Sequence, residues 1–178
     1  MGTTVSVAVH APLVSDDVLG RFFEQLRGVD ARFSPFREDS EVWHQEDYWA
    51  SPLETLEKGQ GDCEDFAIAK YFTLLALGMP ASKLRLVYVR AMIGGPGGPQ
   101  QAHMVLAYYP AAGAEPLILD NLITELRPAS RRPDLVPVFS FNSEGLWQGV
   151  GGPAAGDPTA RLSRWREVLA KARAEGFQ

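Results

Sequence analysis

The chain has 178 residues, of which 46% are hydrophobic and 22% charged, and its formal net charge is −5 at pH 7. This length fits one domain, residues 1–178, that buries roughly 70% of the surface of the unfolded chain. The composition excludes wholesale disorder, the acidic balance argues against a general nucleic-acid binder, and no apolar run of about 18 residues exists to span a membrane.

The first elements in chain order are helical. Residues 1–4 lack the basic and apolar regions of a signal peptide, so we expect either a cytoplasmic protein or a chain whose leader has been removed. Residues 13–28 repeat apolar side chains near the helical period and predict a helix, whereas residues 33–52 are irregular and predict mostly loop. Residues 62–77 predict a second helix, which is apolar almost all round, as a central buried helix would be.

The second half of the chain predicts strands. Strand-like runs are found at 84–92, 102–109, 116–122 and 136–141. Residues 149–158 are rich in Gly, Pro and Ala and suggest a hinge, and residues 159–176 predict an amphipathic terminal helix. A helix followed by a meander of strands favours an α+β fold with an antiparallel sheet.

Cys63 is the single cysteine, which excludes an internal disulfide and a multi-cysteine metal site. Cysteine is commonly an inert buried residue. Cys63, however, follows a glycine-rich turn and lies in the first turn of the second predicted helix. Unsatisfied backbone N–H groups and the helix dipole favour a thiolate there. We therefore interpret Cys63 as a candidate nucleophile.

A nucleophilic cysteine needs a base and a group that orients the base. Of the three histidines, His10 lies in a terminal segment and His44 in the irregular region, whereas His103 begins a predicted strand. If the following turn is centred on residues 112 and 113, His103 faces Leu122 and Asp120 is its diagonal neighbour. A slip of one residue would separate them. The alternative readings are a structural histidine and an aspartate that forms a turn.

Three carboxylates surround the candidate nucleophile, namely Asp62, Glu64 and Asp65. Like charges within about 4–6 Å should raise the pKa of the thiol. The carboxylates could point away as partners of the helix dipole, Asp62 could cap the helix, or the group could hold a hard cation such as Ca²⁺. The spacing differs from that of an EF-hand, and the sequence leaves the three alternatives open.

These motifs resemble a known family. The segments that carry the resemblance are 47–56, 59–67, 70–72, 83–89, 102–108, 117–122, 129–132, 134–135, 139–142 and 145–147. Together they resemble the bacterial transglutaminase-like cysteine proteinases, and within them the LapG-type periplasmic proteases. The resemblance covers residues 13–148 as a catalytic core and leaves 149–178 as hinge plus terminal helix.

The resemblance implies a papain/transglutaminase-like α+β fold, with the helix that carries the cysteine packed on an antiparallel sheet. It implies a Cys63–His103–Asp120 triad, and a Ca²⁺ site formed by Asp62 and Glu64 with Asp65 as a companion. Such proteases act in the periplasm on a large repeat adhesin, which they cut near its N-terminus at a di-alanine site to release it from the cell surface. A LapD-like inner-membrane receptor for cyclic di-GMP sequesters them.

The expected chemistry is acyl transfer to Cys63, with His103 as base and Asp120 as orienting group. The backbone N–H of Cys63 would be one oxyanion donor, and Gln60 and Trp49 are candidates for the second. Two rivals remain. One is an acyltransferase of the transglutaminase or arylamine acetyltransferase kind, which would use the same triad with an amine in place of water. The other is a binding module that has lost catalysis.

Overall fold

A computed structural model describes residues 37–123 and 125–177. The helix predicted at 13–28, and His10, lie outside these residues. The described elements in chain order are α2 (Asp39–Val42), α3 (Pro52–Lys58), α4 (Cys63–Ala76), η1 (Ala81–Lys83), β1 (Leu84–Met92), β2 (Gln100–Tyr108), β3 (Leu117–Leu119), β4 (Arg127–Pro128), η2 (Ala129–Arg131), β5 (Leu135–Phe141), β6 (Leu146–Gln148), β7 (Ala154–Gly156), α5 (Pro158–Arg161) and α6 (Ser163–Ala174).

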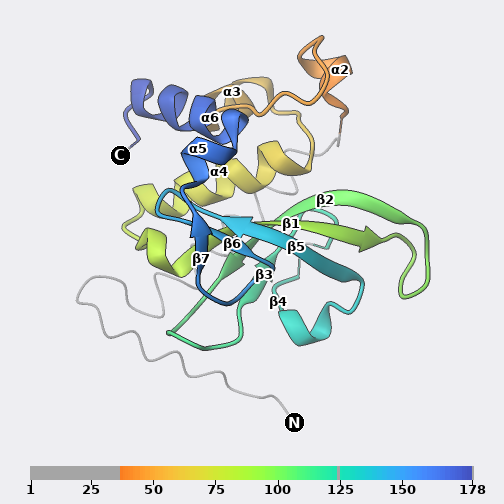
Figure 1. Ribbon diagram of the computed structural model, residues 1–178. Coiled ribbons are helices and arrows are strands. Elements are labelled where there is room, and N and C mark those ends of the chain that lie inside the picture. Colours follow the sequence, from red (N-terminus) through yellow and green to blue (C-terminus); the bar gives the residue numbers. More distant parts are fainter. Residues whose placement is uncertain (1–36, 124, 178) are drawn as a thin grey trace.

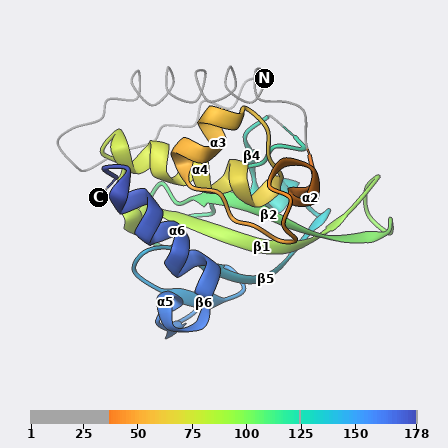
Figure 2. The same ribbon diagram turned by 90° about the horizontal axis from the view of Figure 1, so that it is seen from above.

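The strands form one antiparallel sheet in the order β4-β3-β2-β1-β5-β6-β7. Helices α4 and α6 lie over one face of it (Figures 1 and 2). The α+β prediction is therefore confirmed. None of the helices in the described ranges has the length and apolar character needed to cross a bilayer.

Successive side chains of a strand point to opposite faces of the sheet, so the apolar residues of β1 and β2 form two clusters. Leu86, Met104 and Leu106 belong to the main core beneath α4 and α6, whereas the alternate residues Val87 and Val105 belong to a smaller cluster. Helix α4 carries buried residues on nearly every side, as predicted for residues 62–77. It is the central helix of the core.

The register between β2 and β3 is the predicted one. Leu106 pairs with Leu119 and Ala107 with Ile118, so continuing the ladder toward residue 103 places His103 opposite Leu122. β3 is shorter than expected and ends at Leu119, because Asp120 uses its side chain to accept a hydrogen bond from the backbone N–H of Leu122 at 3.0 Å. That turn leaves Asp120 beside His103.

The C-terminal segment differs from the expected hinge and single helix. Residues 149–158 contain β7, which pairs with β6 and extends the sheet. The terminal helix is broken at Leu162, whose ψ of 92° is not helical, into α5 and α6. Lys171 on α6 donates hydrogen bonds to Glu54 of α3 and to the backbone carbonyl of Trp49. The segment is thereby tied to the loop before α3.

Truncation of Trp165 is expected to show how much α6 contributes to stability. Its ring is fully buried against Tyr71 and Phe141, and its Nε1 donates to the carbonyl of Asn142 at 3.1 Å. We expect Trp165→Ala to lower the free energy of unfolding by about 3–5 kcal/mol, measured by urea denaturation. Glu167→Ala, an exposed change on the same helix, is the control and should change it by less than about 0.5 kcal/mol. Equal losses in both variants would contradict this packing role.

Candidate active site and metal site

Cys63 is the first residue of α4, and the residues before it explain its position. Asp62 is the N-cap, and its side chain accepts a hydrogen bond from the backbone N–H of Asp65. α4 packs against β2, and the backbone N–H of Met104, next to His103, interacts with the Cys63 sulfur. The helix start therefore brings the thiol to the strand that carries His103.

The thiol is protonated in this arrangement. Burial raises the pKa of Cys63 well above its usual range, and the negative charge of Glu64 raises it further. The thiol donates a hydrogen bond to Glu64 Oε2 at 2.7 Å. The conflict between thiolate and carboxylates that the sequence indicates is thus present in the structure.

His103 and Asp120 are in direct contact. His103 Nε2 lies 2.7 Å from Asp120 Oδ1, and both side chains are buried. Burial raises the pKa of Asp120, but the contact with His103 and the hydrogen bonds from the Leu122 N–H and Arg132 lower it to about 2, so the carboxylate is ionised at neutral pH. An ionised carboxylate only accepts hydrogen bonds. Nε2 therefore carries the proton, and Nδ1 is the ring nitrogen left to accept one.

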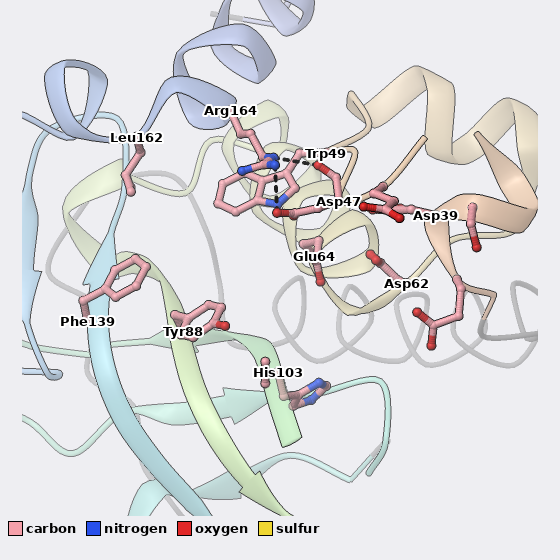
Figure 3. A pocket seen from close by; sticks show the side chains of 14 residues that line it. Asp39, Asp47, Trp49, Asp62, Glu64, Tyr88, His103, Phe139, Leu162 and Arg164 are labelled. Atoms are coloured by element: carbon pink, nitrogen blue, oxygen red, sulfur yellow. Dashed lines mark hydrogen bonds and ion pairs between the residues drawn. The ribbon is translucent and has the colours of Figure 1, made fainter. Parts of the chain in front are cut away.

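A cleft of about 670 Å³ opens beside His103. Figure 3 shows His103 on one side, with Asp62 and Glu64 across from it and the rings of Tyr88 and Phe139 along the wall. These two rings stack at 5.2 Å between centroids. A bulge between β1 and β5 at Tyr88/Val89 accompanies this stack. The cleft thus joins a histidine, an acidic side and an apolar wall.

The C-terminal segment supplies the rim of the cleft. Leu162 and Arg164 line it, and Arg164 Nη2 lies 2.8 Å from Asp47 Oδ2 (Figure 3). Asp47 has a positive φ of 54°. The sequence did not indicate that Asp47, Leu162 and Arg164, or Tyr88 and Phe139, line a cleft. Periodicity predicts which face of a strand or helix is buried, but not which elements meet at a cleft.

An acidic cluster lies next to the thiol. Asp39, Asp62 and Asp65 are all buried, and one carboxylate oxygen from each lies within 4.8 Å of the others. Two of them, Asp62 and Asp65, were predicted as metal ligands. The third predicted ligand, Glu64, is not in this group, and its carboxylate accepts the hydrogen bond from the thiol. Asp39 was missed, since the irregular segment around it has no period that would place it near residue 62.

Burial and mutual repulsion disfavour charge on these aspartates. The pKa of Asp39 is raised to about 6, that of Asp65 to about 7 and that of Asp62 to about 10, in each case chiefly by burial and further by neighbouring carboxylates. Among the described residues, no ion pair reaches any of the three. Within residues 37–123 and 125–177, no side-chain cation therefore balances a charge on these aspartates.

The donor set fits a hard divalent cation. Asp39 Oδ1 is buried and has no hydrogen-bond partner in the described part of the chain, whereas its Oδ2 accepts from the backbone N–H of Tyr48 at 2.5 Å. Asp65 is fixed by the backbone N–H of Ala50 at 2.8 Å and by Trp43 Nε1 at 3.2 Å. A converging group of buried carboxylates with a free oxygen is the kind of site that Ca²⁺ prefers.

The two oxyanion candidates lie in different surroundings. Gln60 is exposed and does not line the cleft. Trp49 lines the cleft and stacks on Phe141 at 5.8 Å, and its Nε1 has no hydrogen-bond partner within the described ranges. Because that nitrogen is covered by neighbouring atoms, Trp49 would reach a substrate only after a small local movement. His44 is exposed and lies outside the cleft lining.

Comparisons with known proteins identify relatives. The family described as bacterial transglutaminase-like cysteine proteinase BTLCP matches residues 16–150. Among solved structures, calcium-bound LapG of Legionella pneumophila is 42% identical, with a TM-score of 0.68, over 83% of this chain and 78% of that one. The EGTA-treated form is 36% identical, with a TM-score of 0.70, over 91% of this chain and 100% of that one. No curated protein matches.

Proposed function

The chain belongs to the bacterial transglutaminase-like cysteine proteinases and has the LapG transglutaminase-like fold, and we propose that it is a calcium-dependent periplasmic endopeptidase. The proposed substrate is a large repeat adhesin, cut near its N-terminus at a di-alanine site and so released from the cell surface. The proposed regulator is a LapD-like cyclic di-GMP receptor. The observation that carries the proposal is the contact between the ionised Asp120 and His103. His103 directly precedes Met104, whose backbone N–H interacts with the Cys63 sulfur.

The proposed reaction begins with proton transfer from the Cys63 thiol to His103 Nδ1, while Asp120 keeps Nε2 protonated. The sulfur attacks the scissile carbonyl carbon, and the backbone N–H of Cys63 stabilises the oxyanion, with Trp49 Nε1 as the second candidate donor. The imidazolium of His103 then gives its proton to the leaving amine. Water, deprotonated by His103, hydrolyses the thioester and frees Cys63.

Calcium dependence is supported by Asp39, Asp62 and Asp65 and by the calcium-bound relative. Glu64 is proposed as a further ligand from the family resemblance. A bound divalent cation would supply positive charge that offsets Glu64 and Asp62, which raise the pKa of Cys63 in addition to burial. The residues of this chain then move the proton as described above.

The wall formed by the rings of Tyr88 and Phe139 supports a substrate with uncharged side chains at the scissile bond, because the rings offer contact area but no charge partner. The experiment is incubation of the protein and Ca²⁺ with an adhesin N-terminal fragment and an added primary amine. We expect two fragments separated at the di-alanine bond, and no cleavage of a fragment in which Glu-Glu replaces that pair. Mass spectra dominated by an amine adduct would instead indicate an acyltransferase.

Gly61→Ala tests the metal cluster without removing a carboxylate. A Cβ at this position would lie 2.7 Å from Asp65 Oδ2 and 2.9 Å from Asp65 Cβ, so the Asp65 side chain must shift. We expect Ca²⁺ affinity to fall by about tenfold, which corresponds to about 1.4 kcal/mol, in isothermal titration calorimetry. Gln60→Ala, at the exposed neighbour, is the control. Unchanged affinity in Gly61→Ala would place the ion away from Asp65.

A further inference from the structure

We propose that Arg132 is a positioning residue of the proposed triad, fixing the carboxylate of Asp120 so that His103 keeps one tautomer and one ring orientation. The inference rests on the proposed function, in which Asp120 orients His103. The sequence indicated no role for Arg132, which lies twelve residues beyond Asp120, after β4 and η2.

The two oxygens of Asp120 have separate partners. Oδ1 faces His103 Nε2 at 2.7 Å and accepts from the backbone N–H of Leu122 at 3.0 Å. Oδ2 accepts from Arg132 Nη2 at 2.6 Å. Because each oxygen is held from a different direction, the carboxylate plane cannot turn without breaking a charge-assisted bond. Arg132 therefore determines which oxygen is presented to His103.

Arg132 is itself fixed. It is only 3% exposed, and its Nε and Nη2 both donate to Asp134, with the shortest contact at 2.8 Å. A planar guanidinium held by two carboxylates has a defined orientation that a lysine ammonium cannot reproduce. The order Asp134–Arg132–Asp120–His103 thus forms a continuous chain of hydrogen bonds that ends at the ring of His103.

The hydrogen bond from Arg132 also favours the ionised form of Asp120: burial raises the pKa of this carboxyl, and the contacts with His103, the Leu122 N–H and Arg132 together lower it. Lys70 Nζ donates to the main-chain carbonyl of Asp120 at 3.2 Å, and Arg132 donates to the carboxylate itself. A carboxylate that loses its cationic partner in a buried site takes up a proton more readily. A protonated Asp120 could donate to Nε2, which would move the ring proton to Nδ1, the nitrogen that must accept the thiol proton.

The experiment combines kinetics with NMR spectroscopy of the full chain. For Arg132→Gln we expect kcat to fall roughly 10- to 100-fold, the size typical of outer-shell hydrogen-bond partners at metal-bound histidines, with KM changed by less than about twofold. Ring ¹⁵N shifts, with His103 assigned from the His103→Ala spectrum, should show loss of the single Nε2–H tautomer. Arg131→Gln, the same change at the exposed neighbour, should alter neither.

Arg132→Lys keeps the charge and loses the planar fork, so it should restore the tautomer and only part of kcat. Thermal unfolding first shows whether Arg132→Gln is folded. If it is not, the same kinetic and ¹⁵N measurements are made on Arg132→Lys. A folded Arg132→Gln variant with wild-type kcat and a single Nε2–H tautomer would overturn the proposal. Because the ¹⁵N readout needs no substrate, an inactive wild-type protein would contradict the protease assignment and leave the test of Arg132 intact.

Discussion

Cys63→Ala is expected to lower kcat for cleavage of the proposed adhesin substrate by about 10⁶-fold, and His103→Ala by a similar amount, because each variant removes a component without which the others cannot act. Cys63 would lose the nucleophile, and His103 the nitrogen that accepts its proton. Asp120→Asn should cost about 10⁴-fold, since an amide can present N–H to His103 and stabilise the wrong tautomer. Cleavage is followed by mass spectrometry of the substrate fragments.

The control is structural. Cys63→Ala should keep the wild-type unfolding midpoint and bind Ca²⁺, because Asp39, Asp62 and Asp65 are unchanged. The Cys63→Ala/His103→Ala double variant should be no slower than either single variant, as expected of residues that act as a unit. Retained cleavage in Cys63→Ala would sink the assignment of the nucleophile.

Calcium removal is expected to produce the second large effect, on activity and stability together. Chelation should abolish cleavage, because the charges of Glu64 and Asp62 then add to burial in holding the pKa of Cys63 high. Asp39→Asn should weaken Ca²⁺ binding by about tenfold or more, that is, by at least about 1.4 kcal/mol. Glu46→Gln removes an exposed carboxylate from the same cleft and serves as the matched control.

The pH dependence has a definite sign. The pKa values of Asp39 and Asp65 are raised to about 6 and about 7, and that of Asp62 to about 10. Carboxylates with raised pKa values stabilise the metal-free fold below about pH 4, and this contribution is lost as pH rises through those values. Protons also compete with the cation for the same oxygens. Both effects predict that Ca²⁺ raises the unfolding midpoint more at pH 8 than at pH 5.

Scanning calorimetry at the two pH values, with Ca²⁺ or with chelator, measures this difference. The Asp39→Asn variant should show a smaller calcium-induced shift at pH 8, and Glu46→Gln a wild-type shift. A calcium-induced shift that is equal at pH 5 and pH 8 would mean that these aspartates are not the ligands.

The sequence predicted the part of the site that local pattern determines. The apolar run after Cys63 defines a buried helix, and the turn after β2 defines the hairpin register that brings Asp120 to His103. Both features depend on neighbours in the chain. A one-residue error in register would have placed Asp120 on the other face of the sheet.

The remaining residues come from contacts that no local pattern encodes. Asp39 reaches Asp62 because the segment before α3 folds back over the start of α4, held by the bond from the backbone N–H of Tyr48. Arg132 reaches Asp120 from beyond β4. Arg164 reaches the cleft because α6 packs on the core through Trp165. Each is a single long-range contact of an ordinary polar or charged residue.

Alkylation of Cys63 tests the central claim most directly. Because the chain has one cysteine, the mass of the intact protein is enough to show how far this thiol has reacted. Iodoacetamide should add a single group to Cys63, faster in Ca²⁺ than in chelator and slower in His103→Ala than in wild type. Equal alkylation rates under all three conditions would contradict a Cys63 nucleophile activated by His103 and controlled by calcium.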